Sequence, residues 1–157
     1  MSDAGRIDLG VLIGPDRVFA GVRALDKQKL LAELGKRAAA ALGLGVADVI
    51  ASLAAREALG STGIGAGIAV PHARLEGLGD MVGFFARLQQ PIEFNAIDGK
   101  KVDLVFLLLS PARGPAAHLA ALAAIARRLR DPEAAAAIRA AGSEAQIRDI
   151  LLGSARQ

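Results

Sequence analysis

The run from Val102 to Leu109 constrains the fold of this chain most strongly, because seven of its eight residues are apolar. Strands with one face in water alternate apolar and polar residues, whereas strands covered on both faces are apolar almost throughout. The run therefore predicts an inner strand of a sheet that carries protein on both faces. Its longest uninterrupted apolar stretch, Leu104–Leu109, is too short for a bilayer, which requires about 20 residues.

Helical and extended patterns alternate along the rest of the chain. Capping residues support the helices: Asp26 and Ser143 precede two of them, Gly43 follows one, and Pro115 suits a first helical position. Strands between helix pairs predict an α/β fold with helices on both faces of a sheet. No repeat or linker divides the sequence, so residues 1–157 are expected to form one domain. The predicted helices are 27–42, 46–58, 115–129, 132–142 and 144–152, and the predicted strands are 18–22, 68–71, 81–88 and 102–109.

Composition excludes several classes of protein. Hydrophobic residues make up 53% of the chain, which is too many for a disordered segment. The absence of cysteine excludes disulfide scaffolds, thiolate metal sites and a cysteine nucleophile. Five Phe and no Trp or Tyr leave few rings on which bases could stack, so no nucleic-acid partner is expected. The first residues, Met1–Arg6, lack the layout of a signal peptide, so a cytoplasmic protein without membrane insertion is expected.

A glycine-rich stretch at 60–67 precedes His72, the first of two histidines. Glycines let backbone N–H groups approach an anion without obstruction by a Cβ atom. Imidazole is a good nucleophile near neutral pH, because its unperturbed pKa is about 6.5. The stretch matches neither the Walker A pattern nor the dinucleotide-binding pattern. Two interpretations stay open: the glycines only form tight turns, or they hold an anion beside His72.

His118 and Arg56 are further candidates for contact with an anion. His118 falls in the first turn of the helix predicted from Pro115, where unpaired N–H groups and the helix dipole favour a phosphate and a neutral imidazole. Arg56 falls at the end of the helix before the glycines, and its planar guanidinium suits a phosphate. The alternatives are a solvent-exposed helix histidine and an ordinary helix-end charge. Two histidines without cysteines make a zinc site the weakest hypothesis, so no metal is expected.

The segment from Arg56 to Glu76, REALGSTGIGAGIAVPHARLE, resembles the active-site signature of the IIA proteins of the bacterial phosphoenolpyruvate-dependent phosphotransferase system. It is most similar to the nitrogen-regulatory branch, which is related to the fructose and mannitol IIA domains. The resemblance covers nearly all of residues 8–152. It continues through Pro91–Phe94, Asp98-Gly99, Val102–Leu109, Pro111, His118-Leu119 and Ile125–Leu129.

This resemblance implies a three-layer α/β/α fold with a mixed sheet between helices. It also implies a phosphohistidine carrier that acts as a nitrogen or metabolic regulator. In that family pattern His72 carries the phosphoryl group on Nε2, His118 contacts the group without carrying it, and Arg56 lies beside the site. The hydroxyl residues of the pattern correspond to Ser61 and Thr62. The expected phosphate-binding backbone groups are those of Gly63, Gly65 and Gly67.

The partner implied by the resemblance is a phosphorylated HPr-like carrier protein, which docks on an exposed apolar rim around His72. No cofactor is required. Relatives often have a polar residue at position 66, where this chain has Ala66, so one polar contact of the site is expected to be missing. One alternative is a regulator in which phosphorylation is only a signal and sensor kinases or transporters are the targets. The other is the IIA component of a fructose- or mannitol-type sugar uptake system.

Overall fold

The computed structural model describes residues 7–153. The expectations about Met1–Arg6 and about the last four residues of the predicted domain therefore lie outside the described residues. The elements, in chain order, are α1 (Leu9–Leu12), β1 (Ile13–Val22), α2 (Lys27–Leu42), α3 (Val46–Ala58), β2 (Gly63–Gly65), β3 (Ile68–Ala69), β4 (His72–Leu75), β5 (Val82–Ile92), β6 (Val102–Pro111), α4 (Pro115–Arg130), α5 (Pro132–Ala140) and α6 (Glu144–Leu152).

The sheet is mixed, with the order β1-β5-β6-β3-β2, and β4 also pairs with β6. β6 runs antiparallel to β5 and parallel to β3 and β4. The residues from Leu104 to Leu109 are each 0% exposed. The prediction of an inner strand covered on both faces is therefore confirmed.

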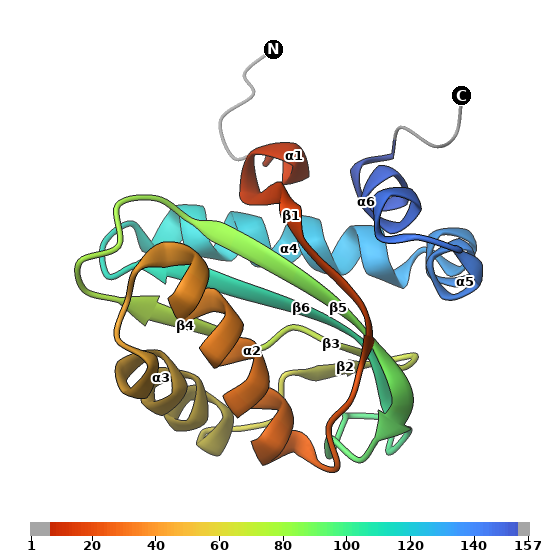
Figure 1. The fold of residues 1–157 in the computed structure, drawn as a ribbon, viewed down its shortest axis with the longest axis horizontal. Helices are drawn as coiled ribbons and strands as arrows, with labels where there is room; N and C mark the ends of the chain where they lie inside the picture. Colours follow the sequence, from red (N-terminus) through yellow and green to blue (C-terminus); the bar gives the residue numbers. More distant parts are fainter. Residues whose placement is uncertain (1–6, 154–157) are drawn as a thin grey trace.

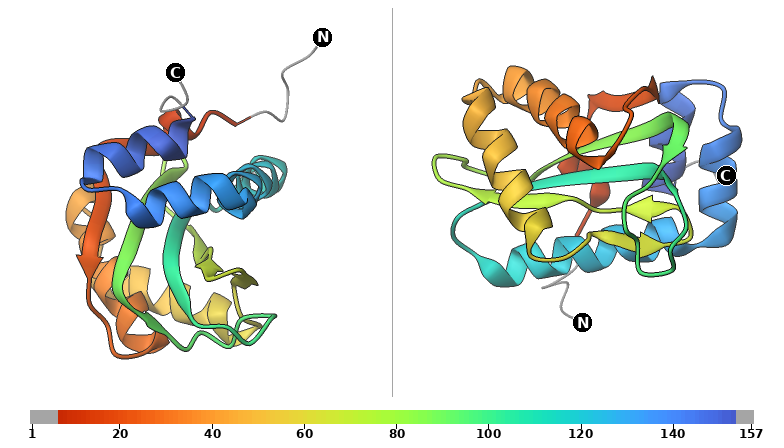
Figure 2. Two further views of the ribbon diagram at one scale, coloured as in Figure 1. Left: turned by 90° about the vertical axis from the view of Figure 1, so that its right-hand side faces the viewer. Right: turned by 90° about the horizontal axis from the view of Figure 1, so that it is seen from below.

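Helices cover both faces of this sheet, α2 and α3 on one side and α4, α5 and α6 on the other (Figures 1 and 2). Successive residues of β6 divide between the two sides, because side chains of a strand point alternately to opposite faces. Leu107 and Leu109 pack with the α2 and α3 residues, whereas Phe106 and Leu108 pack with the α4–α6 residues. The three-layer α/β/α architecture is confirmed.

The capping residues predicted from the sequence occupy their expected positions. Asp26 accepts a hydrogen bond from the backbone N–H of Lys29, and Gly43 ends α2 in the left-handed conformation with a φ of 70°. Ser143 accepts from the backbone N–H of Gln146. The Gln146 side chain accepts from Gly142 instead of Ser143, so this helix start forms only one half of a capping box.

The structure also contains elements that the sequence patterns did not predict. Helix α1 and strands β2 and β4 are additional, and β1 begins at Ile13 instead of Val18. The first part of β1 contains Gly14 and Pro15, and its register against β5 shifts between Ile13 and Val18. Such residues hide a strand from pattern analysis, and β1 pairs with β5 on either side of them, at Ile13 and at Val18. None of the helices between residues 7 and 153 is both long and apolar enough to cross a membrane.

Candidate functional site

The two histidines meet at the end of the sheet. His72 is the first residue of β4, and it pairs in register with Leu108 of β6. Helix α4 follows β6 after three residues and has His118 in its first turn. The two imidazole rings have their centroids 5.2 Å apart and lie edge to face, with 61° between their planes.

Each nitrogen of His72 has a different partner. Nδ1 lies 2.8 Å from the carbonyl oxygen of Val70, which can only accept, so Nδ1 carries the proton. Nε2 accepts a hydrogen bond of 3.1 Å from Nε of Arg56 and therefore carries the lone pair. Burial is the main cause that lowers the pKa of His72, and the Arg56 charge lowers it further. His72 is thus a neutral imidazole near pH 7 whose Nε2 carries the lone pair.

Arg56 is directed at Nε2 of His72 by a second hydrogen bond. It lies in the last turn of α3, and its Nη1 donates to the carbonyl oxygen of Gly60 at 2.9 Å. The guanidinium is therefore held between the end of α3 and His72. This arrangement places a planar cation 3.1 Å from Nε2 of His72, and it does not support the alternative of an ordinary helix-end charge.

Glu57 is a site residue that the sequence analysis missed. Its side chain is buried, accepts hydrogen bonds from the backbone N–H and hydroxyl of Thr62 at 2.8 and 2.7 Å, and forms an ion pair of 3.0 Å with Lys27. These contacts tie the segment after α3 to both α2 and α3. No local sequence signal could have found the ion pair, because packing of α2 against α3 brings Lys27 to Glu57.

The hydroxyl residues expected at the site are already engaged within the protein. Thr62 donates its hydroxyl to Glu57. Ser61 donates its hydroxyl to the carbonyl oxygen of Phe94 and accepts from the N–H of Gly63. Ser61, Thr62 and Gly63 therefore use these groups to hold the chain next to His72.

Gly65 ends β2, and Gly67 lies in the turn between β2 and β3. Ile68, the next residue, pairs with Leu104, four residues from the partner of His72 along β6, roughly 13 Å at about 3.3 Å per residue. Asp98 lies within contact distance of a Cβ built on Gly65, and Asp103 lies beside Gly67. Both glycines have positive φ, 102° and 82°, so the turn requires them. This placement supports the tight-turn interpretation and does not support a phosphate at Gly65 or Gly67.

Ala66 occupies the same turn, with a φ of 58°. Its N–H donates to the Asp98 carboxylate at 2.9 Å, and its carbonyl oxygen accepts from Arg139 at 2.9 Å. The missing polar side chain at position 66 thus concerns this turn and not the surroundings of His72.

Arg74 is the second site residue that the sequence analysis missed. It lies two positions after His72 in β4, so the two side chains emerge on the same face of the strand. Its Nη2 donates to the carbonyl oxygen of Ala112 at 2.7 Å, in the connection that leads to α4. A spacing of two residues in a strand would have placed Arg74 on the same face as His72, but β4 itself was not predicted.

The His118 side chain is buried, and the residue is only 7% exposed, which excludes a solvent-exposed helix histidine. Burial is the main cause that lowers the pKa of His118 to about 4, and the charges of His72, Arg74 and Arg56 add to it. His118 is therefore neutral at pH 7, as expected for an imidazole at a helix start.

The lowered pKa of His118 predicts a loss of stability in acid. Between pH 6.5 and about 4 the unfolded chain binds a proton at this residue and the folded chain does not, so stability falls as the pH falls through this range. The expected contribution is on the order of 2 kcal/mol, reduced because the site opens to water. Urea unfolding at several pH values measures it, and His118→Gln, which cannot titrate, is expected to flatten the wild-type curve. Parallel curves for both proteins would contradict this assignment.

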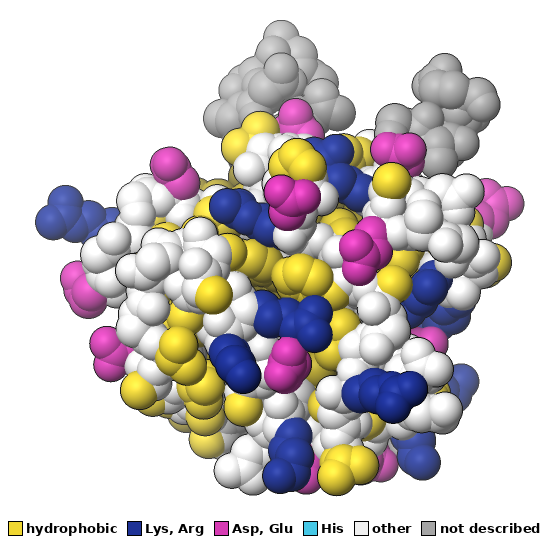
Figure 3. Space-filling model, viewed as in Figure 1, with side chains coloured by type: hydrophobic (Ala, Val, Ile, Leu, Met, Phe, Trp, Pro, Cys, Tyr) yellow, Lys and Arg dark blue, Asp and Glu magenta, His cyan; other side chains and the backbone are white. Residues whose placement is uncertain are grey.

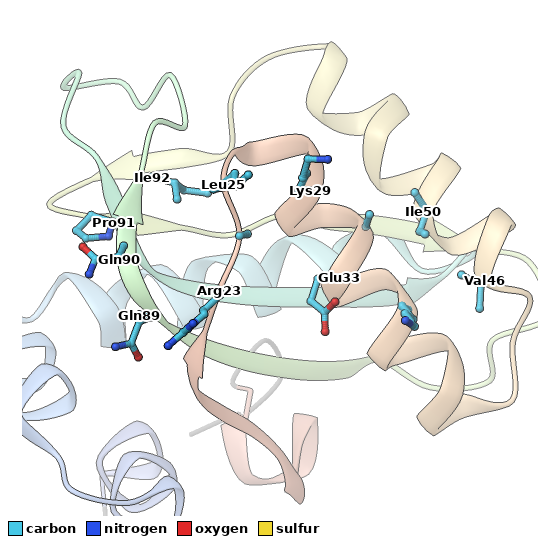
Figure 4. A pocket seen from close by; sticks show the side chains of 13 residues that line it. Arg23, Leu25, Lys29, Glu33, Val46, Ile50, Gln89, Gln90, Pro91 and Ile92 are labelled. Atoms are coloured by element: carbon cyan, nitrogen blue, oxygen red, sulfur yellow. The ribbon is translucent and has the colours of Figure 1, made fainter.

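A groove of about 950 Å³ lies along α2, between the start of α3 and the ends of β1 and β5, and neither histidine lines it (Figure 4). This groove is therefore separate from the site around His72. On the face that α2 and β1 cover, Lys and Arg side chains lie among apolar ones, and neither histidine is visible (Figure 3). Within residues 7–153 no group of three or more His, Asp or Glu side chains is placed to hold a metal ion.

Comparisons with known proteins agree with this geometry. The family model "Phosphoenolpyruvate-dependent sugar phosphotransferase system, EIIA 2" matches residues 12–153. A nitrogen regulatory protein of Bradyrhizobium diazoefficiens is 42% identical over 140 residues, 89% of this chain and 92% of that protein. Its counterpart in Escherichia coli K12 is 40% identical over 146 residues, 92% of this chain and 90% of that protein.

A solved structure shows the same fold. The crystal structure of nitrogen regulatory protein IIA-Ntr from Neisseria meningitidis has a TM-score of 0.87 and 34% identity to this chain, and the match covers 91% of this chain and 98% of that one. Family model, sequence relatives and structure agree over almost the whole described chain. The protein therefore belongs to the EIIA 2 family of the phosphoenolpyruvate-dependent phosphotransferase system.

Proposed function

We propose that this protein is a phosphohistidine carrier, which accepts a phosphoryl group on Nε2 of His72 from an HPr-like carrier protein and acts as a nitrogen or metabolic regulator. One observation carries the proposal: Val70 holds the proton of His72 on Nδ1, so the lone pair is on Nε2, next to Arg56. The nitrogen-regulatory names of the relatives support the regulatory role. As the family implies, we place this activity in the cytoplasm.

The transfer exchanges one nitrogen–phosphorus bond for another. Nε2 of His72 attacks the phosphorus with its lone pair, the bond to the donor's histidine breaks, and the departing imidazole keeps the electron pair. Phosphoryl transfer passes through a loose transition state, so the protein mainly positions groups and neutralises charge. Arg56 is placed to move its hydrogen bond from Nε2 to a phosphoryl oxygen, and His118 supplies a second contact.

The surroundings of His72 fit the docking of a protein donor. Leu59 is 84% exposed and precedes Gly60, which Arg56 contacts. Leu119 is 65% exposed and follows His118. Large apolar side chains that are this exposed gain free energy when a partner covers them. Leu59 and Leu119 are therefore our candidates for the apolar rim on which the HPr-like carrier docks.

Phosphorylation by a reconstituted donor chain tests the proposal. The protein is incubated with phosphoenolpyruvate, the first enzyme of the system and an HPr-like carrier, and the intact mass is measured. We expect one phosphoryl adduct that is labile in acid, as phosphoramidates are, and that peptide mapping assigns to His72. No adduct, or an acid-stable adduct on a hydroxyl residue, would contradict the proposal.

Leu119→Asp is expected to slow phosphorylation of His72 by about tenfold or more when the carrier is below saturation. Burying a leucine contributes about 1.5–3 kcal/mol, and this variant replaces that gain with a charge that must be desolvated. Leu25→Asp is the matched control, because Leu25 is 85% exposed but lines the groove away from the histidines. Equal rates for the two variants would show that Leu119 is not part of the docking surface.

The second candidate function is that of a IIA component in a fructose- or mannitol-type sugar system. It is less supported, because the relatives that match about nine tenths of the chain are named nitrogen regulatory proteins. Onward transfer distinguishes the two functions: a sugar-system IIA component passes its phosphoryl group to a IIB protein. Sensor kinases and transporters are the targets that we predict for the regulatory function.

A further inference from the structure

Ser110 makes a buried contact with His118 that the proposed mechanism leaves unexplained. Its hydroxyl oxygen, near the end of β6, lies 2.7 Å from Nδ1 of His118. Ser110 is 1% exposed, so water does not compete for this hydrogen bond. We propose that Ser110 is a positioning residue, which sets the tautomer of His118 so that Nε2 carries the proton and donates a hydrogen bond to the phosphoryl group. This inference rests on the proposed function of His72.

The direction of the hydrogen bond follows from an account of donors and acceptors. A neutral imidazole has one N–H and one acceptor nitrogen, and a serine hydroxyl has one O–H donor. Within the described chain, Nδ1 of His118 is the one partner that the Ser110 hydroxyl has. If Nδ1 carried the proton, the Ser110 hydroxyl proton would be buried without an acceptor, which is costly. If the hydroxyl donates to Nδ1, both groups are satisfied and the ring proton is on Nε2.

Nε2 of His118 is in a position to use this proton. Among residues 7–153, Arg148 Nε is the one side-chain nitrogen or oxygen that is both fully buried and unpaired. His118 Nε2 has no hydrogen-bond partner there, so it must be in contact with solvent. One nitrogen of the ring is thus held inside the protein by Ser110, and the other is accessible at the edge of the site.

The two histidines then carry opposite tautomers. His72 has its proton on Nδ1, donated to Val70, and the lone pair on Nε2. His118 has its lone pair on Nδ1, accepting from Ser110, and its proton on Nε2. The first tautomer provides the nucleophile, and the second provides an uncharged donor for a phosphoryl oxygen. The other tautomer of His118 would present a lone pair to the anion and repel it.

Nitrogen NMR tests the tautomer directly, without any phosphoryl donor. In a two-bond proton–nitrogen spectrum of the wild-type protein at pH 7, His118 is expected to show a protonated Nε2 and an unprotonated Nδ1, and His72 the reverse. In Ser110→Ala the His118 signals are expected to shift toward a mixture of tautomers. A wild-type His118 protonated on Nδ1, or an unchanged pattern in the variant, would overturn the inference.

Kinetics give the second readout. Ser110→Ala is expected to slow phosphoryl transfer to His72 about two- to tenfold at saturating carrier, with an unchanged apparent KM, because it weakens a contact made to the transferred group and not to the carrier. Ser110→Thr keeps the hydroxyl and is expected to restore both the rate and the tautomer. A wild-type rate in Ser110→Ala, or a change confined to KM, would overturn the inference.

The outcomes separate this inference from the proposed function. If the wild-type protein accepts no phosphoryl group, the proposed function fails, while the tautomer spectrum still decides the role of Ser110. If the wild type is phosphorylated on His72 but Ser110→Ala leaves both tautomer and rate unchanged, only the inference about Ser110 fails. Should the extra methyl group of Ser110→Thr lower the melting temperature, the wild-type and Ser110→Ala spectra suffice to decide.

Discussion

His72→Ala is expected to abolish phosphorylation completely while the protein stays folded. The variant removes the only atom to which we assign attack on phosphorus, Nε2, so no slower route remains. The side chain is half-buried at the start of β4. It donates one hydrogen bond to Val70 and accepts one from Arg56, so its removal leaves the hydrophobic core untouched. Intact mass after incubation with the donor chain measures the adduct, and circular dichroism checks the fold.

His118→Ala is the control that separates the two histidines. It is expected to accept the phosphoryl group on His72 more slowly, and the double variant is expected to be as inactive as His72→Ala. A normal adduct on His72→Ala, or an adduct that maps to His118 in the wild type, would reverse the roles assigned to the two residues.

Arg56→Ala is expected to slow phosphoryl transfer by roughly ten- to a hundredfold. A charged hydrogen bond contributes about 1.5–3 kcal/mol, and here it would act on the transition state, where negative charge spreads over the phosphoryl oxygens. Arg56→Lys keeps the charge but loses the planar fork that contacts both His72 and Gly60, so an intermediate rate is expected. Rapid-quench measurement of adduct formation gives these rates.

Arg37→Ala provides the matched control for Arg56→Ala. Like Arg56, Arg37 lies on a helix. It belongs to α2, is partly exposed and forms an ion pair of 2.7 Å with Glu33. Its removal is expected to leave the transfer rate unchanged, since exposed ion pairs contribute little and Arg37 stacks on Phe19 of β1, which β5 and β6 separate from β4. If Arg56→Ala transferred as fast as Arg37→Ala, Arg56 would have no part in the transfer.

The glycine-rich stretch shows why a local pattern leaves two interpretations open. Glycines that permit a tight turn also permit a backbone to approach an anion, because both require a missing Cβ atom and positive φ. What decides between them is the group that lies opposite. Here Asp98 and Asp103 lie beside Gly65 and Gly67, and neither residue is close to them in sequence.

The sequence alone predicts helices α2 to α6, the inner strand β6 and three residues of the candidate site. The helices followed from apolar spacing and capping residues, and the strand from its uninterrupted apolar run, which are local properties of the chain. His72, His118 and Arg56 were recognised by residue type, position at an element's end and resemblance to a family. These signals involve residues that are close together in the sequence, so they can be recognised without knowledge of the fold.

Which side chains meet, and which ring nitrogen of each histidine carries the proton, depends on the tertiary structure. Pairing of β4 with β6 brings His72 to His118, and packing of α2 on α3 brings Lys27 to Glu57. The tautomers depend on hydrogen bonds of 2.8 Å to Val70, two residues before His72, and of 2.7 Å to Ser110, eight residues before His118. These contacts require the backbone conformation before β4 and at the junction of β6 with α4, and a periodic pattern along the chain carries no information about either.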